Sequence, residues 1–264
     1  MGDINSTAAC ALVATKMQIK VAHIEAGLRS FDMSMPEEIN RKVVDHISDF
    51  LFTTESSGNK NLAKEGVGDE KIFFVGNTMI DTLISNLKTI EREDVLKEYA
   101  LVKGEYCVLT MHRPANVDAF DGLKKRLALI VENIPTNVKV VFPVHPRTQK
   151  AMESIPVEIL DRFLLISPQP YFSFMSLVYH SAFVLTDSGG IQEETTYLKK
   201  PCFTLRPNTE RPSTIEVGSN FLINEDLNKV QPSLKAFDPN KSLIPPLWDG
   251  QAGKRILEKL TEVL

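Results

Sequence analysis

The sequence is poor in cysteine and has no long apolar run. Its 264 residues include only three cysteines, Cys10, Cys107 and Cys202, and they form no C-x-x-C pair. Cysteines spaced this widely are expected to be small buried hydrophobes in a reduced cytosol, which predicts a cytoplasmic location. No apolar stretch approaches the roughly 20 residues that a bilayer-spanning helix needs, so a membrane is not an expected partner.

The chain also lacks a strong charge of either sign. Its formal net charge is −4 and its pI is about 5.8, so nothing indicates binding to nucleic acid. A hydrophobic content of 43% and a charged content of 24% are typical of a soluble globular protein of one or two domains. A phosphate-bearing ligand would therefore need local cations.

Short β-prone runs alternate with helical patterns along most of the chain. Such an alternation predicts an α/β fold with parallel sheets. Strands are expected at 21–26, 49–54, 71–77, 106–112, 138–145, 163–168, 183–187 and 201–206, and helices at 5–17, 36–47, 78–90, 120–134, 191–198 and 253–264. A charged stretch without a strand, 88–104, predicts a domain junction. We expect domains at 1–90 and 91–247, followed by a segment, 248–264, whose helix could pack across both.

The run S-A-F-V-L-T-D-S-G-G-I-Q-E-E at 181–194 joins a buried strand directly to a helix. Asp187 or Ser188 can cap that helix, and the two glycines that follow let the backbone turn and leave its amides open to a ligand. Free N–H groups at a helix start suit a phosphate. An ordinary turn, in which Glu193 and Glu194 only complement the helix dipole, is an equally open alternative on this segment alone.

Polar residues end several of the predicted strands, where ligands of open α/β sheets bind. His112 and His145 close successive strands and could transfer a proton or bind phosphate, because histidine titrates near neutrality. A loop histidine bonded to backbone is the alternative for each. Glu25 ends the strand at 21–26 and faces either a site or a buried arginine.

Acidic residues also mark two predicted helix starts. Ser34 and Glu37 form an S-x-x-E capping box with Pro36 at the helix start, although a cap and a catalytic carboxylate can coexist there. Arg41 follows Glu37 by four residues and shares its helix face. Asp3 lies just before a helix, where an N-cap role is the plain alternative to a catalytic one.

Two arginines and two aromatic residues have both a functional and a plain interpretation. Arg206 and Arg211 could neutralise a diphosphate held on the Ser-Gly-Gly amides, but each alone is more often a surface ion pair. Phe172 and Phe174 are expected in the core, although an aromatic ring near a strand end can stack on a base.

Taken together, these segments resemble the non-hydrolysing UDP-N-acetylglucosamine 2-epimerases, which have the two-domain GT-B fold. The matching motifs follow in family order: G-D-x-N-S at 2–6, H-I-E-A-G-L-R-S at 23–30, P-E-E-I-N-R at 36–41, V-G-N-T-M-I-D at 75–81, H-R-P-A-N at 112–116, P-V-H-P at 143–146, D-S-G-G-I-Q-E-E at 187–194, T-E-R-P-S-T-I-E-V-G at 209–218 and D-G-Q-A-G-K-R-I at 249–256. The resemblance implies an α/β, GT-B-like fold with two Rossmann-type parallel-sheet domains.

The resemblance also implies a site. Its acid/base residues would be Asp3, Glu25, Glu37 and His112. The predicted UDP-sugar-binding residues are Arg41, Arg113, His145, Phe174, Ser188, Gly189, Gly190, Glu194 and Arg211. In the family the Ser-Gly-Gly turn holds the diphosphate, the matching Glu holds the ribose hydroxyls, and the positions of His145 and Arg113 contact a regulatory UDP-sugar in some bacterial members. The sequence around these two differs from the usual H-P-N and H-R-R-E-N. No metal site and no cofactor are predicted.

The implied activity is the interconversion of UDP-GlcNAc and UDP-ManNAc, by elimination and re-addition of UDP through a 2-acetamidoglucal, in a full-length homodimer. Three alternatives stay open: a hydrolysing 2-epimerase that releases ManNAc, a GT-B glycosyltransferase, and a non-catalytic UDP-sugar-binding remnant. The last is motivated by the G-D motif at residue 2, because family members begin well before it with a strand and a Gly-Thr-Arg-Pro-Glu loop. We therefore expect a truncated chain or a misassigned start, with an incomplete N-terminal domain.

Overall fold

The computed structural model describes residues 2–111, 120–144, 148–149, 152, 155–224 and 226–263. The chain divides into two compact units. Unit 1 comprises Met1–Ser85, Thr209–Glu216 and Ile244–Leu264, and unit 2 comprises Asn86–Asn208 and Val217–Leu243. The sequence suggested a junction at 90/91 with a last helix across both domains. Packing divides the chain after Ser85 and assigns both the segment 209–216 and the last helix to unit 1.

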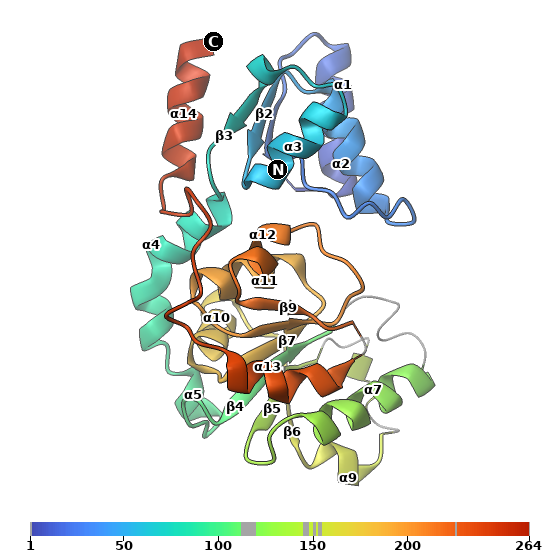
Figure 1. Cartoon of the computed structure of the whole chain (residues 1–264), viewed down its shortest axis with the longest axis vertical. Helices are drawn as coiled ribbons and strands as arrows, with labels where there is room; N and C mark the ends of the chain where they lie inside the picture. Colours follow the sequence, from blue (N-terminus) through green and yellow to red (C-terminus); the bar gives the residue numbers. More distant parts are fainter. Residues whose placement is uncertain are drawn as a thin grey trace. The chain divides into compact units, whose positions relative to one another are not determined.

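Unit 1 is built on a parallel sheet whose three described strands run in the order β1 (Ala22–Ala26), β2 (Phe50–Thr53) and β3 (Ile72–Phe74) (Figure 1). Its helices are α1 (Asn5–Lys16), α2 (Pro36–Ile47), α3 (Ser56–Lys64), η1 (Asp69–Lys71), the start of α4 (Thr78–Arg92), α12 (Pro212–Glu216) and α14 (Ala252–Val263). Side chains of successive strand residues point to opposite faces of a sheet. Leu51 accordingly packs with Leu62 of α3, and Phe52 packs on the other face with Ile256 of α14.

Polar contacts at the start of helix α14 hold it against the rest of unit 1. The Asp81 carboxylate, on α4, accepts hydrogen bonds from the amides of Ala252 (3.1 Å) and Gly253 (2.7 Å), which are first-turn amides without a helical partner. Arg255 of α14 donates to the carbonyl of Val75 at 3.0 Å. These bonds bring the chain between β3 and α4 close to the segment that precedes α14.

Gly76 lies at that close approach, and a substitution there should be costly. Its φ is +91°, and an added Cβ would lie 2.1 Å from the carbonyl oxygen of Leu247. We expect Gly76→Ala to destabilise the protein by about 1–3 kcal/mol for the strained backbone alone, with the clash in addition. Gly66 is the matched control, because its φ of +83° carries the backbone cost while nothing lies within 4 Å of an added Cβ. Urea unfolding of both variants measures the difference, and equal losses would contradict the proposed close contact.

Unit 2 contains a six-stranded parallel sheet within the described residues. Its strands are β4 (Tyr106–Thr110), β5 (Lys139–Pro143), β6 (Phe163–Ile166), β7 (Phe183–Thr186), β8 (Cys202–Thr204) and β9 (Asn220–Leu222), in the spatial order β6-β5-β4-β7-β8-β9. Counted from β4, this is the 3-2-1-4-5-6 order of a doubly wound Rossmann sheet. The strand order reverses between β4 and β7, and ligands of such sheets bind at the carboxyl ends of the strands at that point.

Helices cover both faces of the six-stranded sheet. They are the end of α4, α5 (Val95–Glu98), α7 (Phe120–Asn133), α9 (Val157–Leu160), α10 (Tyr171–His180), α11 (Gly189–Tyr197), η2 (Leu227–Lys229) and α13 (Val230–Ala236). Helices α10 and α11 lie on one face, and α7 and α13 lie on the other (Figure 1). With both faces covered, the central strands are continuous apolar runs such as Cys107–Leu109 and Val184–Leu185, all fully buried.

Two of the three cysteines are buried, as predicted, and the third is not. Cys107 and Cys202 lie in strands of unit 2, where burial raises the pKa of each thiol. Cys10 is exposed on α1, so the prediction of a buried hydrophobe is wrong there. The alanine-rich surface of that helix gave no pattern that distinguishes its inner from its outer face. In the part of the chain that the structure describes, no helix combines the length and the apolar character needed to cross a membrane.

Candidate functional site

Glu25 of β1 has an unusual backbone conformation. Its φ is +75°, and the pairing of β1 with β2 shifts register between Ile24 and Ala26. A left-handed conformation is uncommon for a residue other than glycine and costs on the order of 1–3 kcal/mol. Register shifts of this kind occur next to active sites, where they re-aim a side chain. The conformation therefore indicates that the direction of the Glu25 side chain is important enough to offset the backbone strain.

The re-aimed Glu25 side chain meets Arg211, which immediately precedes α12. Its Oε1 accepts a hydrogen bond from Arg211 Nη2 at 2.9 Å. Arg211 is buried, while the Glu25 side chain stays 21% exposed. The sequence left open whether Glu25 faces a site or a buried arginine. It contacts a buried arginine, and its side chain remains partly exposed.

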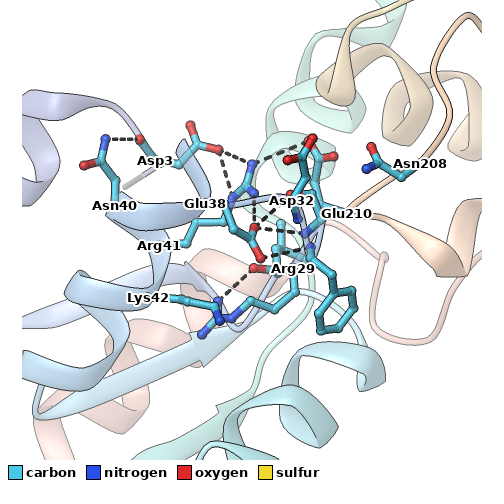
Figure 2. Close-up of polar contacts among 12 residues, drawn as sticks. Asp3, Arg29, Asp32, Glu38, Asn40, Arg41, Lys42, Asn208 and Glu210 are labelled. Atoms are coloured by element: carbon cyan, nitrogen blue, oxygen red, sulfur yellow. Dashed lines mark hydrogen bonds and ion pairs between the residues drawn. The ribbon is translucent and has the colours of Figure 1, made fainter. Parts of the chain in front are cut away.

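Asp3 makes a comparable pair with Arg41 of α2 (Figure 2). Its Oδ2 accepts from Arg41 Nε at 3.0 Å and from Nη2 at 2.6 Å, and the Asp3 side chain is 30% exposed. The plain alternative, an N-cap, does not hold, because the N-cap residue of α1 is Ile4. Asp3 thus resembles Glu25 in being a partly exposed carboxylate held by a buried arginine.

Glu38, which the sequence did not single out, is the second acid on Arg41. It is fully buried, and its Oε2 accepts from Arg41 Nη1 at 2.7 Å. Further hydrogen bonds come from the Ser30 amide at 2.9 Å, the Ser30 hydroxyl at 3.0 Å and the Phe31 amide at 3.0 Å. With this many donors and no exposure, Glu38 is a structural residue that orients Arg41. The only signal in the sequence was its i,i+3 spacing to Arg41.

Glu37 occupies a different position from the one that its motif suggested. It is half-buried, and the described residues include no hydrogen-bond or ion-pair partner for it. The predicted capping box is wrong: the N-cap residue of α2 is Met35 and makes no side-chain cap, while the Ser34 hydroxyl donates to Asp32 Oδ1 at 2.6 Å. Pro36 does begin the helix, as predicted.

Glu210 connects the two acid–arginine pairs. Its Oε1 accepts from Arg211 Nη1 at 2.7 Å and lies 3.6 Å from Arg41 Nη2. Its side chain is only 4% exposed. Asp3, Arg41, Glu210, Arg211 and Glu25 therefore form a row of alternating charges within unit 1, which we call the acid–arginine chain. The candidate acids Asp3 and Glu25 are its two ends.

A second buried network fixes the turn that follows Glu25. Asp45 accepts from Arg29 Nη1 at 2.7 Å and from the Gly27 amide at 3.1 Å, and it lies 2.7 Å from His23 Nδ1. Arg29 also donates to both carboxylate oxygens of Glu65, which lowers the pKa of Glu65. The H-I-E-A-G-L-R-S motif thus carries one candidate acid together with the charges that hold its loop.

Glu55, two residues after the end of β2, lies near the segment that carries Arg211. Its buried carboxyl group accepts a hydrogen bond from the Ser57 hydroxyl and lies near Ser213 and Arg211. Burial raises its pKa, and the polar contacts with these serines together with the charge of Arg211 partly offset that rise. The sequence gave no signal for this contact, because Ser213 and Glu55 lie in distant segments.

The Ser-Gly-Gly turn of unit 2 follows β7, at the point where the strand order reverses. Helix α11 begins at Gly189, with Gly190 next and Ser188 as the N-cap residue. The predicted position of the cap is correct, but its side chain makes no capping bond; the Ser188 amide donates to Thr186 Oγ1 at 3.0 Å. A helix start at this place in a doubly wound sheet can bind an anion.

Glu194 lies one turn further along α11 and is buried. Its Oε1 accepts from the hydroxyl of Tyr171, on α10, at 2.9 Å. Burial raises the pKa of Glu194 to about 7, although the bond from Tyr171 opposes this rise. The carboxyl group is therefore poised between its charged and uncharged forms near neutral pH. Phe174, the predicted base-stacking residue, is half-buried on the same helix as Tyr171.

Three predicted site residues, His112, Arg113 and His145, lie outside the described residues. Within the described residues, no group of three or more His, Cys, Asp or Glu side chains could hold a metal ion.

The fold and these sites define an α/β protein with a doubly wound sheet, a helix start suited to phosphate and a separate cluster of paired acids. The chain belongs to the UDP-N-acetylglucosamine 2-epimerase family, whose model matches residues 1–261. It is 41% identical over 269 residues to the UDP-N-acetylglucosamine 2-epimerase of Methanocaldococcus jannaschii, covering 98% of this chain and 74% of the relative. It is 38% identical to the UDP-2,3-diacetamido-2,3-dideoxy-D-glucuronate 2-epimerase of Pseudomonas aeruginosa, covering 99% of this chain and 73% of that relative.

Solved structures show the same likeness. The crystal structure of the M. jannaschii enzyme in complex with UDP-GlcNAc and UDP superposes with a TM-score of 0.86 at 41% identity, covering 99% of this chain and 74% of the other. The Neisseria meningitidis UDP-GlcNAc 2-epimerase bound to UDP-GlcNAc gives a TM-score of 0.87 at 29% identity, covering 99% and 75%. The predicted α/β, GT-B-like fold class with two Rossmann-type parallel sheets is confirmed.

Proposed function

We propose that this chain is a non-hydrolysing UDP-GlcNAc 2-epimerase, which interconverts UDP-GlcNAc and UDP-ManNAc. The observation that carries the proposal is Glu25, an accessible carboxylate in a strained backbone conformation at the end of the acid–arginine chain. The support is chemical: inversion at a sugar carbon needs paired acid/base groups, and Asp3 supplies a second carboxylate of the same kind. Relatives that bear this activity in their names share about 40% of the sequence.

The reaction needs an elimination because the C2 proton of the sugar is not adjacent to a carbonyl group. A carboxylate removes that proton, a C1–C2 double bond forms, and the C1–O bond breaks so that UDP leaves with the electron pair. UDP then adds back to the 2-acetamidoglucal while a proton is delivered to C2 from the opposite face. We assign these two proton transfers to Asp3 and Glu25, because each is oriented by a buried arginine and is partly exposed. Glu37 and His112 stay predicted members of the acid/base set.

The nucleotide is assigned to unit 2. The helix start at Ser188–Gly190 would hold the diphosphate, and stabilisation of this leaving group is the larger electrostatic contribution to such a reaction. Glu194 would accept hydrogen bonds from the ribose hydroxyls, and Phe174 would contact the base. The ligand contacts proposed for Arg41, Arg113, His145 and Arg211, the homodimer and the cytoplasmic location stay predictions.

Product analysis by proton NMR tests the function. Incubation with UDP-GlcNAc should yield UDP-ManNAc without free sugar. Release of ManNAc and UDP would identify a hydrolysing enzyme, and UDP binding without turnover would identify a non-catalytic binding protein. UDP-2,3-diacetamido-2,3-dideoxy-D-glucuronate should be assayed in parallel, because a 38% identical relative is named for it. A clear preference for that sugar would replace the proposed substrate while keeping the reaction type.

The affinity for UDP should rise with pH around neutrality. Ribose hydroxyls donate hydrogen bonds, so they bind best to the ionised form of Glu194, whose pKa is about 7 in the free protein. From pH 6 to pH 8 the ionised fraction rises about tenfold, and we expect the UDP dissociation constant measured by calorimetry to fall by about the same factor. Glu194→Gln is the control, because it accepts hydrogen bonds without titrating and reveals the pH dependence of UDP itself. Parallel curves for the two proteins would contradict the assignment of Glu194.

A further inference from the structure

We propose that Glu210 is a positioning residue that sets the geometry and the charge of both candidate acids, Asp3 and Glu25. Glu210 lies between the two arginines that hold these acids, and both of them contact its Oε1. The inference rests on the proposed function, because its effect would be felt through the two acid/base groups.

The position of Glu210 follows from the T-E-R-P sequence at 209–212. The adjacent residues Glu210 and Arg211 carry opposite charges, and Arg211 Nη1 donates to Glu210 Oε1 at 2.7 Å. The Arg211 amide donates to the Thr209 hydroxyl at 3.1 Å, and α12 begins directly afterwards at Pro212. The Thr214 hydroxyl of that helix donates to the Arg211 carbonyl at 2.7 Å, so side-chain bonds fix the backbone on both sides of Arg211.

The electrostatic argument concerns two buried guanidinium groups. The side chains of Arg41 and Arg211 are 4% and 7% exposed, and each has a nitrogen within 3.6 Å of the same oxygen, Glu210 Oε1. Buried charges are stable only when they are paired. Glu210 is therefore the counterion that the two arginines share and that keeps both of them facing inward along the acid–arginine chain.

Removing the charge of Glu210 affects both ends of the acid–arginine chain, Asp3 and Glu25. With Glu210→Gln, the other acids beside the arginines stay in place: Asp3 and Glu38 for Arg41, and Glu25 with the nearby Glu55 for Arg211. Each arginine would then stabilise the ionised form of its candidate acid more strongly. The acidic limb of the pH profile of kcat should move to lower pH, and the arginines should lose their fixed orientation.

The test compares kcat, KM and the pH profile of epimerisation for the wild-type chain and three variants. We expect Glu210→Gln to lower kcat by about 100-fold through misplaced acids and to move the acidic limb down by about half to one pH unit. Glu210→Asp retains the charge, so its acidic limb should return toward the wild-type position. Glu216→Gln removes an equal charge from the exposed end of the same segment and should match the wild type.

The outcomes separate the inference from the function on which it rests. A wild-type chain without turnover would overturn both. An active wild type with Glu210→Gln at unchanged kcat, or with reduced kcat and an unmoved acidic limb, would overturn the positioning role and leave the function standing. Should circular dichroism show that Glu210→Gln does not fold, Glu210→Asp decides alone, because it keeps the charge but shortens the side chain: a reduced kcat with a wild-type acidic limb supports the role, and a wild-type kcat contradicts it.

Discussion

Replacement of Glu25 by glutamine should lower the rate of epimerisation by about 10²- to 10⁴-fold, the range that general acid–base groups contribute. Glutamine has nearly the same shape and can still accept the hydrogen bond from Arg211 Nη2, so the local fold should persist. It cannot take or deliver a proton. Because the diphosphate and ribose contacts proposed for Ser188–Gly190 and Glu194 belong to unit 2, and glutamine can keep the bond to Arg211, the dissociation constant of UDP should change by no more than about twofold.

Steady-state kinetics and calorimetry on the same preparations measure these two effects. Glu70, an exposed acid in η1 of the same unit, is the matched control, and Glu70→Gln should have wild-type activity. If Glu25→Gln kept more than a tenth of the wild-type rate, Glu25 would not be one of the two acid/base groups. Its strained backbone would then need another explanation.

Replacement of Asp45 by alanine should destabilise the fold by about 3–5 kcal/mol, the usual cost of removing one member of a buried charged pair. Asp45 is 1% exposed, and its carboxylate pairs with the fully buried Arg29 while also bonding His23 and the Gly27 amide. The variant leaves the buried Arg29 guanidinium with one of its two carboxylate partners, Glu65, and removes the acceptor that holds the turn after Glu25. The midpoint of urea unfolding should fall accordingly.

Glu258→Ala is the control for this loss. Glu258 forms an i,i+4 pair with Lys254 on α14, where both side chains are more than half exposed, so its removal should cost no more than about 0.5 kcal/mol. Equal destabilisation by the two variants would show that the buried network around Asp45 is not a principal support of unit 1.

Strands and helices with a clear period were predictable from the sequence, and short or uniformly apolar ones were not. All eight predicted strands occur within a few residues of their expected positions, and the helix at Pro36–Ile47 has the predicted bounds. Helix α10 was missed because Y-F-S-F-M-S-L-V-Y-H is apolar on nearly every side. A helix of this kind shows no alternation of apolar and polar residues with the 3.6-residue helical period. Strand β9 was missed because Asn220–Leu222 is too short to show an alternation.

The candidate site was predictable residue by residue but not as a set of contacts. Asp3 and Arg41 are 38 residues apart, and Glu25 and Arg211 are 186 residues apart, so no local pattern could pair them. Glu38 and Glu210 each have a partner close in sequence, but the burial of Glu38 and the approach of Glu210 to Arg41 arise only in the folded chain. The Ser34–Glu37 capping box failed because a nearer acceptor, Asp32, takes the Ser34 hydroxyl.

Epimerisation of UDP-GlcNAc in deuterated water, followed by NMR, tests the central claim most directly. If carboxylates of the acid–arginine chain remove and return the C2 proton, the UDP-ManNAc that forms must carry deuterium at C2. Glu25→Gln should show neither product nor exchange at a comparable rate. UDP-ManNAc that keeps the original proton at C2 would contradict the account, because inversion would then proceed without proton exchange through these acids.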